Sequence, residues 1–376
     1  MNLIAYFVMS LTLMAVSAKK DQVTLLFVGD ISFSGPVKYY VEHKYHTYND
    51  SFNEVAPHIR QADISVGNLE SPFVSQDVYG HIYKGKKLVL LDASPEAAPA
   101  LSFAGFDVMT LANNHLNDFG SEGVNFTVDV LKKTRVKYFG VTYGKYDSSQ
   151  EPLILERRGI KIGFLGYCDS ITAAIDKNCT EMRMLFNSGP ALYRDDIATR
   201  DFNKLKQAKV DIIVVFIHYG QERCLGPRPY QHRINKHLMS LGAHVIIGSH
   251  PHVLQPHCVT EDNKVIAHSL GNFLFYPNRP IGGGNPEVYG RLGNKPDKLL
   301  IESYEHFVLE SPENLKASRM LKVTISRSGI VGAKYLPLKV AFDPKTKRIH
   351  PEPKKKAKWI LVCGVEDKQC QPCHKS

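Results

Sequence analysis

Clusters of Asp, Glu, Asn and His follow several of the most apolar segments of this sequence, and these residue types bind metals and transfer protons. Each cluster begins where a run of β-branched and other apolar residues ends. The side chains that stand out are, in chain order, Asp30, Glu70, Asn113, Asn114, His115, His218, His250 and His252. Ligands of open α/β sheets bind beyond the carboxyl ends of the strands. If the strands are neighbours, these groups therefore form one site.

The chemistry that such a set favours is metal-dependent hydrolysis. Asp, Glu, Asn and His together form a mixed set of oxygen and nitrogen ligands, which suits one or two divalent ions of Mn, Fe or Zn. A thiolate-rich site or an all-oxygen Ca²⁺ site has a different composition. A carboxylate such as that of Glu70 is able to bridge two ions about 4 Å apart, as in two-metal hydrolases.

Single residues of the set have simpler interpretations. Asp30 is also typical of a capped turn, Asn113 and Asn114 are typical turn formers, and His218 is compatible with a hydrogen-bonded core histidine. The metal-site hypothesis therefore depends on the joint placement of these residues at strand ends. In the Gly-Ser-His-Pro-His segment that ends at residue 252, the fixed φ of Pro251 is expected to aim both imidazoles at one place.

Alternating strands and helices must position these groups. Apolar and β-branched runs predict strands at 22–28, 64–66, 107–111, 161–167, 211–217 and 244–247. Amphipathic spacing predicts helices at 52–62, 122–133, 197–208 and 230–241. The alternation predicts an α/β protein with a mixed or mostly parallel sheet and helices on its faces.

The pattern changes towards the end of the chain. Strands are predicted at 264–267, 320–325 and 330–336, with Ser328-Gly329 at a hairpin turn. The segment 277–296 is rich in Gly, Pro and Asn, which predicts a long loop. Because no linker marks a second domain, residues 19–345 are expected to form a single domain.

The first eighteen residues carry no charged side chain, and the apolar run from Leu3 to Val16 is followed by small residues. This pattern predicts a signal peptide over residues 1–18 and a secreted, extracellular protein. The alternative is an uncleaved membrane anchor, although a spanning helix needs about 20 apolar residues. Three Asn-x-Ser/Thr triplets, which begin at Asn49, Asn125 and Asn178, are compatible with a glycoprotein.

Seven cysteines follow this segment, and in a secreted chain they predict disulfides with one cysteine left over. Cys370-x-x-Cys373 predicts a terminal disulfide staple. Half of a zinc site is the alternative, but the sequence has no second pair with suitable spacing.

Basic residues are concentrated at the end of the chain, whose net charge is +10. Between Lys347 and Ser376 there are eight Lys or Arg and three Asp or Glu. Residues 346–376 are expected to form a basic, Cys-containing tail, which is either a solvated surface or a contact for an acidic polymer or a membrane surface. Nucleic acid is not an expected partner, because no basic motif interleaved with aromatic residues is present.

Together the motifs resemble the CapA family of poly-γ-glutamate capsule biosynthesis proteins, whose domain is similar to the calcineurin-like metallophosphoesterase fold. Six motifs between residues 25 and 275 carry the resemblance, in the order that the family has: Gly29-Asp30, Asn68-Leu69-Glu70, Ala112-Asn113-Asn114-His115 with Asp118 and Gly120, His218-Tyr219-Gly220-Gln221-Glu222, Gly248-Ser249-His250-Pro251-His252-Val253 and Ser269-Leu270-Gly271-Asn272-Phe273. The resemblance implies a four-layer αββα sandwich, in which two mixed sheets pack face to face with helices outside.

The resemblance also implies roles for individual residues. The implied metal ligands are Asp30, Glu70, Asn114, His218, His250 and His252. Glu70 stands where metallophosphoesterases carry a bridging Asp. His115 would protonate a leaving group or stabilise the transition state. Glu222 belongs to the capsule-family motif and would be an acid, a base or a further ligand.

One position departs from the phosphoesterase pattern. Those enzymes carry Asp-x-His after the first strand, whereas this chain has Asp30-Ile31-Ser32, as the capsule family commonly does. The chain therefore lacks one histidine ligand. The expected consequence is weak binding of the first metal, or a site that holds a single ion.

Two functions remain in competition. The first is a metal-dependent hydrolase or transferase that acts on an anionic substrate, either a polyglutamate-type polymer or a phosphoester. The second is a non-catalytic protein that binds an acidic polymer or serves as a scaffold around a degenerate site. The missing histidine and the basic tail favour the second function, whereas the retained ligands and His115 favour the first, because a scaffold needs none of them.

Overall fold

The computed structural model describes residues 21–85, 87, 89–170, 179–275 and 312–373. The signal peptide predicted at 1–18 and most of the loop predicted at 277–296 therefore lie outside the described residues. In the described part of the chain, no helix is long and apolar enough to cross a membrane.

A six-stranded sheet is built around β9 (Ile212–Gly220), all nine residues of which are buried. The strand order is β11-β12-β10-β9-β7-β6, and β7, β9, β10 and β12 are parallel. The other strands of this sheet are β6 (Leu153–Arg157), β7 (Ile160–Ser170), β10 (Val245–Ser249), β11 (Leu254–Val259) and β12 (Val265–Leu270). Among the described residues, β6 and β11 form the two edges of this sheet. The strand β6 pairs antiparallel with β7, and β11 pairs antiparallel with β12.

A nine-stranded sheet contains the first and last strands of the described chain. Its central order is β16-β15-β14-β1-β2-β3-β4, with β13 beside β1 and β17 beside β15. The parallel strands are β1 (Val23–Ile31), β2 (Ile64–Leu69), β3 (Val108–Thr110), β4 (Lys137–Phe139) and β13 (Asn272–Leu274). The antiparallel strands are β14 (Ala317–Ser326), β15 (Gly329–Asp343), β16 (Arg348–Pro353) and β17 (Ile360–Leu361).

The two sheets pack face to face, because their strands alternate two apolar faces. In β9, Ile212, Val214 and Phe216 face the core between the sheets, whereas Ile213 and Val215 face the helices outside. Leu25 and Phe27 of β1 face the same inter-sheet core.

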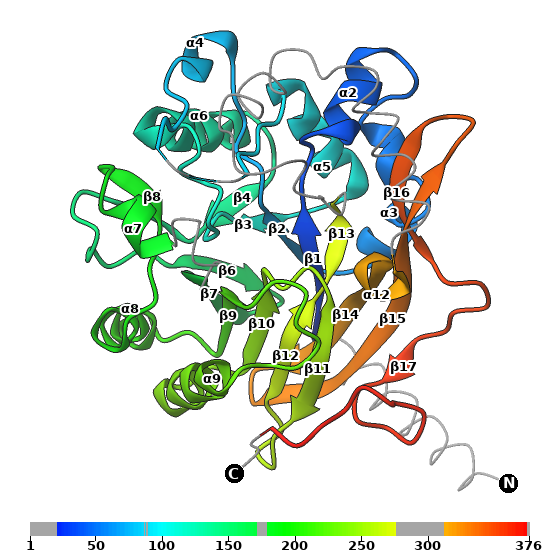
Figure 1. Ribbon diagram of the computed structural model, residues 1–376. Coiled ribbons are helices and arrows are strands. Elements are labelled where there is room, and N and C mark those ends of the chain that lie inside the picture. Colours follow the sequence, from blue (N-terminus) through cyan, green and yellow to red (C-terminus); the bar gives the residue numbers. More distant parts are fainter. Residues whose placement is uncertain (1–20, 86, 88, 171–178, 276–311, 374–376) are drawn as a thin grey trace, which may run out of the picture.

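Helices cover both outer faces, so the four-layer αββα sandwich implied by the resemblance is confirmed (Figure 1). Over the nine-stranded sheet lie α2 (Pro36–Glu42), α3 (Ala56–Ile59), α5 (Ala98–Ala104) and α6 (Gly120–Lys132). Over the six-stranded sheet lie α8 (Asp195–Gln207) and α9 (Pro229–Leu241). Short elements complete the described chain: η1 (Asn49–Phe52), α4 (Gln76–Tyr79), η2 (Pro95–Ala97), α7 (Cys179–Arg183), α12 (Glu313–Lys316) and the small sheet of β5 (Val141–Tyr143) and β8 (Ser188–Pro190).

Three of the four predicted helices are present, but the helix predicted at 52–62 is wrong. Two separate pieces, η1 and α3, take its place. Pro57 explains the break, because proline has no N–H for the i−4 carbonyl and is tolerated only in the first turn of a helix.

The segment after residue 345 is built into the nine-stranded sheet. Its strand β16 pairs with β15 from Arg348 to Pro353, and β17 pairs with the same strand. The lysines at 354–356 are exposed beyond β16.

The terminal staple predicted between Cys370 and Cys373 is wrong. Both cysteines form disulfides, but Cys370 pairs with Cys363 and Cys373 pairs with Cys258. The disulfide between Cys258 and Cys373 joins the end of the described chain to β11. It forms there because backbone pairing places residues 369–371 beside His257. Cys168 and Cys179 form the third disulfide, which leaves Cys224 as the free cysteine of the described chain.

The same region contains a buried ionic network. The guanidinium of Arg319 donates to His257 Nδ1 and, over 2.6 Å, to the carbonyl oxygen of Gln255. His257 Nε2 contacts the Asp367 carboxylate at 2.5 Å. Burial and the neighbouring Arg319 charge lower the pKa of His257 to about 4. The imidazole is therefore neutral in the folded protein at neutral pH.

Thiol titration tests the disulfide pattern. We expect the protein, denatured without reductant, to react at Cys224 alone, which is one thiol per chain. After reduction, all seven cysteines of the sequence should react. Three or more free thiols before reduction would contradict the pairing.

Acid titration tests the buried network. An unfolded histidine takes a proton near pH 6.5, whereas folded His257 does so only near pH 4. Between these values the unfolded state binds more protons, so lowering the pH from 7 to 5 should cost about 2 kcal/mol of unfolding free energy through this group. His257→Gln should lose about that part of the pH dependence in urea denaturation, whatever its stability at pH 7. An unchanged slope would contradict the assignment.

Candidate metal centre

The candidate site lies where strands of both sheets end. Asp30, near the end of β1, pairs in register with Asn68 of β2 and with Asn272 of β13. In the other sheet, His218 of β9 pairs with Ser249 of β10. Thus the strand ends that the sequence analysis singled out do meet, and they do so across two sheets.

Gly29 permits the close approach of β1 and β13. A Cβ atom at this position would lie 1.8 Å from the carbonyl oxygen of Gly271, so any side chain would displace the backbone. The backbone N–H of the next residue, Asp30, donates a hydrogen bond of 3.1 Å to that same carbonyl oxygen. The glycine thus fixes the depth at which the Asp30 carboxylate enters the site.

Asp30, Glu70 and His252 form a first group of ligand atoms. Their oxygen and nitrogen atoms all lie within 4.8 Å of one another. His252 Nδ1 lies 3.4 Å from an Asp30 oxygen, and His252 Nε2 lies 3.7 Å from Glu70 Oε1. Two carboxylates and an imidazole at this spacing are able to hold a divalent ion.

Asn114, His218 and His250 form a second group beside the first. His218 Nε2 lies 2.9 Å from Asn114 Oδ1 and 3.1 Å from His250 Nδ1. His218 Nε2 also lies 3.7 Å from Glu70 Oε1, and His252 Nε2 lies at the same distance from that oxygen. Glu70 therefore stands between the two groups, the place that a bridging carboxylate requires.

The hydrogen-bond inventory of the site fits a metal. Both carboxylate oxygens of Glu70 and the Nε2 atom of His250 are buried and have no hydrogen-bond partner among the described residues. Leaving a charged group unsatisfied in the interior costs several kcal/mol, which a bound cation would offset. The donor set present, oxygen and imidazole nitrogen, is that of a Mn, Fe or Zn site.

Charges within the first group shift its pKa values strongly. Burial and the charge of Asp30 raise the pKa of Glu70 well above its ordinary value. Burial lowers the pKa of His252, but the negative charges of Glu70 and Asp30 outweigh this effect and raise it to about 10. Without a cation, protons must therefore compensate the crowded carboxylates, and a divalent ion would replace them.

The imidazoles of the second group are neutral. Burial lowers the pKa of His250 to about 4, and it lowers the pKa of His218 well below the ordinary value, with a further contribution from neighbouring histidines. Neutral imidazole provides the lone pair that a metal ligand needs.

Backbone conformation aims the two histidines that flank Pro251. His250 has φ 93° and His252 has φ 56°, values that residues with a side chain rarely adopt. Such backbone strain is retained where the surrounding structure fixes it, frequently at functional sites. The fixed φ of Pro251 is therefore not the sole cause of the direction of both rings, because the positive φ values at the histidines also contribute.

His115 is held by a separate buried ion pair. Its Nδ1 atom lies 2.7 Å from Asp118, whose other oxygen accepts from the Lys87 ammonium. Lys87 also donates to the carbonyl oxygen of Asn114 over 2.7 Å. Burial and the Lys87 charge lower the pKa of His115. With Nδ1 occupied by Asp118, Nε2 is the nitrogen that remains for proton transfer.

Glu222 lies on the loop after β9, in a position exposed to solvent. Partial desolvation raises the pKa of Glu222, but the charges of His250, His252 and His115 lower it by a larger amount. The net shift of this pKa is therefore downward. The carboxylate is therefore close enough to sense all three imidazoles and is ionised at neutral pH. The described structure shows no hydrogen bond between Glu222 and the two ligand groups.

Several further residues support the site. Asn68 donates to Asp30 over 2.8 Å, and Asn113 donates to Asn68 over 3.1 Å, so Asn113 orients a neighbour of the ligands. Ser249 contacts His218 Nδ1 at 3.0 Å, and Asn272 contacts His252 Nδ1 at 2.9 Å. Such partners fix the orientation of ligating imidazoles.

Two polar residues near the site, Lys87 and Ser32, are buried although the local sequence does not predict their burial. Lys87 lies in a Lys-Gly-Lys-Lys run that is typical of a solvated surface, yet its side chain is fully buried because Asp118 receives it. Nothing in the local sequence signals this. Ser32, at the position of the missing histidine, is buried and accepts a hydrogen bond from its neighbour Ser34.

Known proteins show similarity in sequence. The model of the family described as bacterial capsule synthesis protein PGA_cap matches residues 24–277. A capsule biosynthesis protein CapA of Bacillus anthracis is 31% identical over 68% of this chain and 61% of its own length. A PGA biosynthesis protein CapA of Bacillus subtilis is 30% identical over 68% of this chain and 64% of its own length. The matches thus span less than two thirds of either relative.

Among solved structures, a sulfate thiohydrolase SoxB of Thermus thermophilus has 11% sequence identity and a TM-score of 0.44, over 89% of this chain and 58% of that chain. The family match covers the strand ends that carry Asp30, Glu70 and the histidines of both ligand groups. This chain therefore belongs to the PGA_cap family of bacterial capsule synthesis proteins.

Proposed function

We propose that this chain is a metal-dependent hydrolase or transferase that acts on an anionic substrate. The observation that carries the proposal is the position of Glu70. Its buried carboxylate lies 3.7 Å from imidazoles of both ligand groups, and neither of its oxygens has a hydrogen-bond partner within the described structure. A non-catalytic scaffold gains no stability from such a group.

Each part of the site would have a distinct task. Asp30, Glu70 and His252 would hold one ion, and Asn114, His218 and His250 would hold a second beside it. A divalent ion supplies charge stabilisation to the reacting group and lowers the pKa of water.

His115 is the residue that would transfer the proton. Asp118 holds its Nδ1–H, which fixes both the tautomer and the direction of the ring. Neutral His115 presents a lone pair at Nε2, so it would accept a proton from the attacking water or hydroxyl group and then deliver that proton to the leaving group. Lys87 holds Asp118 in place and would be a positioning residue.

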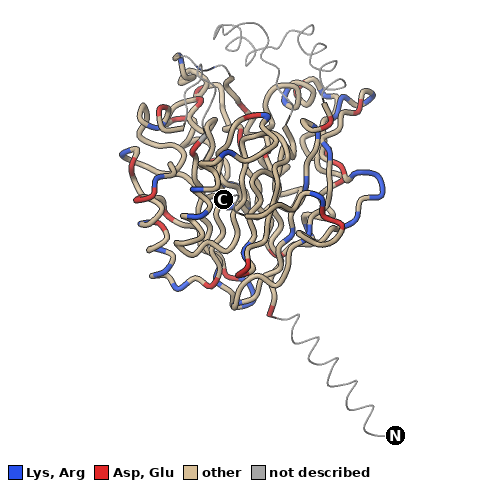
Figure 2. The backbone as a smooth tube through the Cα atoms, turned by 60° about the horizontal axis from the view of Figure 1, so that its bottom comes forward, with Lys and Arg blue, Asp and Glu red and all other residues tan. Residues whose placement is uncertain are grey.

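The substrate class follows from charge and from the relatives. The names of the two Bacillus relatives refer to capsule or PGA biosynthesis, which supports a polyglutamate-type polymer as the substrate. A phosphoester, which is also anionic, is the alternative substrate. The three exposed lysines at 354–356 would bind the same polymer, or an anionic membrane surface. In Figure 2, basic and acidic residues are interspersed over the described backbone, and we propose no nucleic acid partner.

We also propose that the protein is secreted. Its disulfides support this, because such bonds persist in oxidising compartments. Asn49 and Asn125, which begin two of the three sequons, are exposed, as glycosylation requires.

Metal content tests the centre directly. After reconstitution with Mn²⁺, Fe²⁺ or Zn²⁺ and removal of free ions, elemental analysis should find one or two equivalents in the wild type. Glu70→Gln keeps the shape of the side chain and removes its charge, so it should weaken metal binding by more than about tenfold. Asp195→Asn removes the charge of an exposed carboxylate on α8 and is the matched control.

The outcomes are distinct. Stoichiometric metal in the wild type and the control, with loss in Glu70→Gln, supports the centre. Absence of metal from the wild type after every reconstitution would refute the hydrolase mechanism and leave the polymer-binding function.

Substitution of His115 tests catalysis separately from metal binding. His115→Ala should keep the metal content of the wild type, because its Nδ1 faces Asp118 and not the ligand groups. Turnover of the best substrate found among phosphoesters and γ-glutamyl amides should fall by about 10²–10⁴-fold, the range for loss of a general acid or base. Wild-type turnover by this variant would show that His115 transfers no proton.

A further inference from the structure

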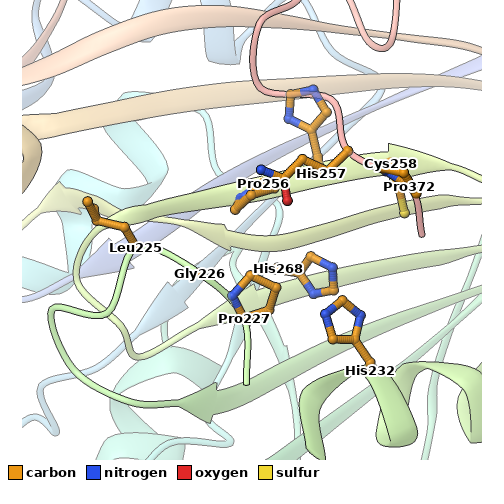
Figure 3. A pocket seen from close by; sticks show the side chains of 10 residues that line it. Leu225, Gly226, Pro227, His232, Pro256, His257, Cys258, His268 and Pro372 are labelled. Atoms are coloured by element: carbon orange, nitrogen blue, oxygen red, sulfur yellow. The ribbon is translucent and has the colours of Figure 1, made fainter. Parts of the chain in front are cut away.

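A cavity of about 320 Å³ lies outside the metal centre, between α9, β11 and the end of the described chain (Figure 3). Three histidines, His232, His257 and His268, are part of its lining. Burial is the main cause that lowers the pKa of His257 to about 4 and that of His268 to about 3. These two rings are neutral at neutral pH, so they offer no charge to an anionic ligand.

A surface of the opposite character lies on the outer face of the nine-stranded sheet. Lys322 of β14 and Lys334 of β15 are paired directly in register, so their side chains lie on the same face with Cβ atoms about 5 Å apart. Their neighbours along the strands, such as Leu321 and Tyr335, face the core between the two sheets. Because side chains alternate along a strand, both ammonium groups point away from that core.

Trp359 contacts Lys322 on this outer face. The Nζ atom of Lys322 lies 4.0 Å from the centroid of the indole ring, which is a cation–π contact. This contact leaves the charge in place. Burial and the charge of Lys322 lower the pKa of His58, and burial and the charge of Lys334 lower the pKa of Lys322. The neighbouring groups therefore sense the positive charge and do not compensate it.

Three further lysines extend the positive charge beside β15. The turn at 354–357 is joined to β15 by a hydrogen bond of 3.1 Å from its first N–H to the carbonyl oxygen of Pro337, and Trp359 follows two residues later. What we call the lysine patch consists of Lys322, Lys334, Lys354, Lys355 and Lys356. None of these ammonium groups has an ion pair with a carboxylate of the described chain.

The lysine patch favours a polymeric anion over a small one. Like charges that face each other across two strands destabilise a sheet, and an anionic ligand would remove this cost. A single exposed ammonium–carboxylate pair contributes little in water, so a small anion would bind weakly. A linear polyanion engages several lysines with one chain, and every contact after the first is intramolecular.

We propose that the lysine patch binds a polycarboxylate chain, with neighbouring carboxylates paired to Lys322 and Lys334 and later ones to the lysines at 354–356. The choice of a polycarboxylate rests on the proposed function. The site itself contains no candidate metal ligand, so it would hold the chain whether or not the metal centre is loaded.

The same surface fits a membrane less well. Proteins that bind a membrane surface insert apolar and aromatic side chains at the level of the headgroups. Trp359 is only partly exposed, because it packs against the core under the helices and Lys322 lies over its ring. The indole is therefore not available for insertion.

Fluorescence of the full-length protein tests the proposal. Trp359 is the single tryptophan of the sequence, so tryptophan emission reports on this surface alone. Poly-L-glutamate should change the emission in a saturable manner at low salt, and sodium glutamate at the same carboxylate concentration should not. Because salt screens exposed charges, the affinity should fall by at least about tenfold between about 0.02 M and about 0.2 M NaCl.

Three results of this titration would overturn the proposal. The first is the absence of a saturable change with poly-L-glutamate. The second is an equal change with sodium glutamate, which would show that no polymer is needed. The third is an equal change with phosphatidylserine vesicles at the same charge concentration, which would identify a membrane surface as the partner.

Substitutions at one lysine locate the binding site. Lys334→Gln should weaken binding of poly-L-glutamate by about threefold to fivefold, the effect of one exposed ion pair, and Lys334→Arg should bind within about twofold of the wild type. Lys236→Gln removes an exposed ammonium on α9, over the other sheet, and should bind as the wild type does. Lys334→Gln also removes a like-charge contact, so its urea midpoint should not fall below that of the wild type, which shows that the variant is folded.

Two further outcomes separate this proposal from the metal-dependent mechanism. Equal weakening by Lys236→Gln and Lys334→Gln would show that binding follows net charge, and would refute the lysine patch. Glu70→Gln should keep the wild-type fluorescence titration, and its loss in this variant would assign the polymer to the metal centre instead. Absence of metal from the wild type, with the fluorescence titration intact, would refute the hydrolase mechanism alone.

Discussion

The buried carboxylate of Glu70 is the group around which the rest of the site is arranged. Burial and the neighbouring charge of Asp30 raise its pKa. Positive charge must compensate two carboxylates in a protein interior, because desolvation there costs several kcal/mol per ion. His252 supplies part of that charge, and Glu70 Oε1 lies 3.7 Å from an imidazole of each ligand group.

This electrostatic requirement explains several costly features of the backbone. Gly29 allows β13 to lie against β1, which places Asn272 next to Asp30. His250 and His252 adopt positive φ values, and the ring of His250 contacts His218 whereas that of His252 contacts the two carboxylates. These features lower stability locally, and the two-sheet core packed on both sides by helices compensates for them.

The histidines of this protein divide into two electrostatic classes. His252 lies between carboxylates and has a raised pKa, whereas His218, His250, His257 and His268 are buried and neutral. In the neutral rings, the hydrogen-bond partner of one nitrogen decides what the other nitrogen offers. The amide N–H of Asn235 at Nδ1 of His268 leaves an N–H donor at Nε2, while Asp118 at Nδ1 of His115 leaves an acceptor at Nε2.

The sequence by itself determined the class of fold and the composition of the site. Continuous apolar and β-branched runs such as 211–217 predicted the strands, and residues at their carboxyl ends, from Asp30 to His252, supplied the candidate ligands. Local pattern is sufficient here because a strand that is buried on both faces is apolar at nearly every position. Tertiary structure alone decided the assignment of β1 and β9 to different sheets, the burial of Lys87, and the pairing of Cys258 with Cys373 across 115 residues. These contacts join residues far apart in sequence, so no local pattern encodes them, and only packing of the two sheets brings their partners together.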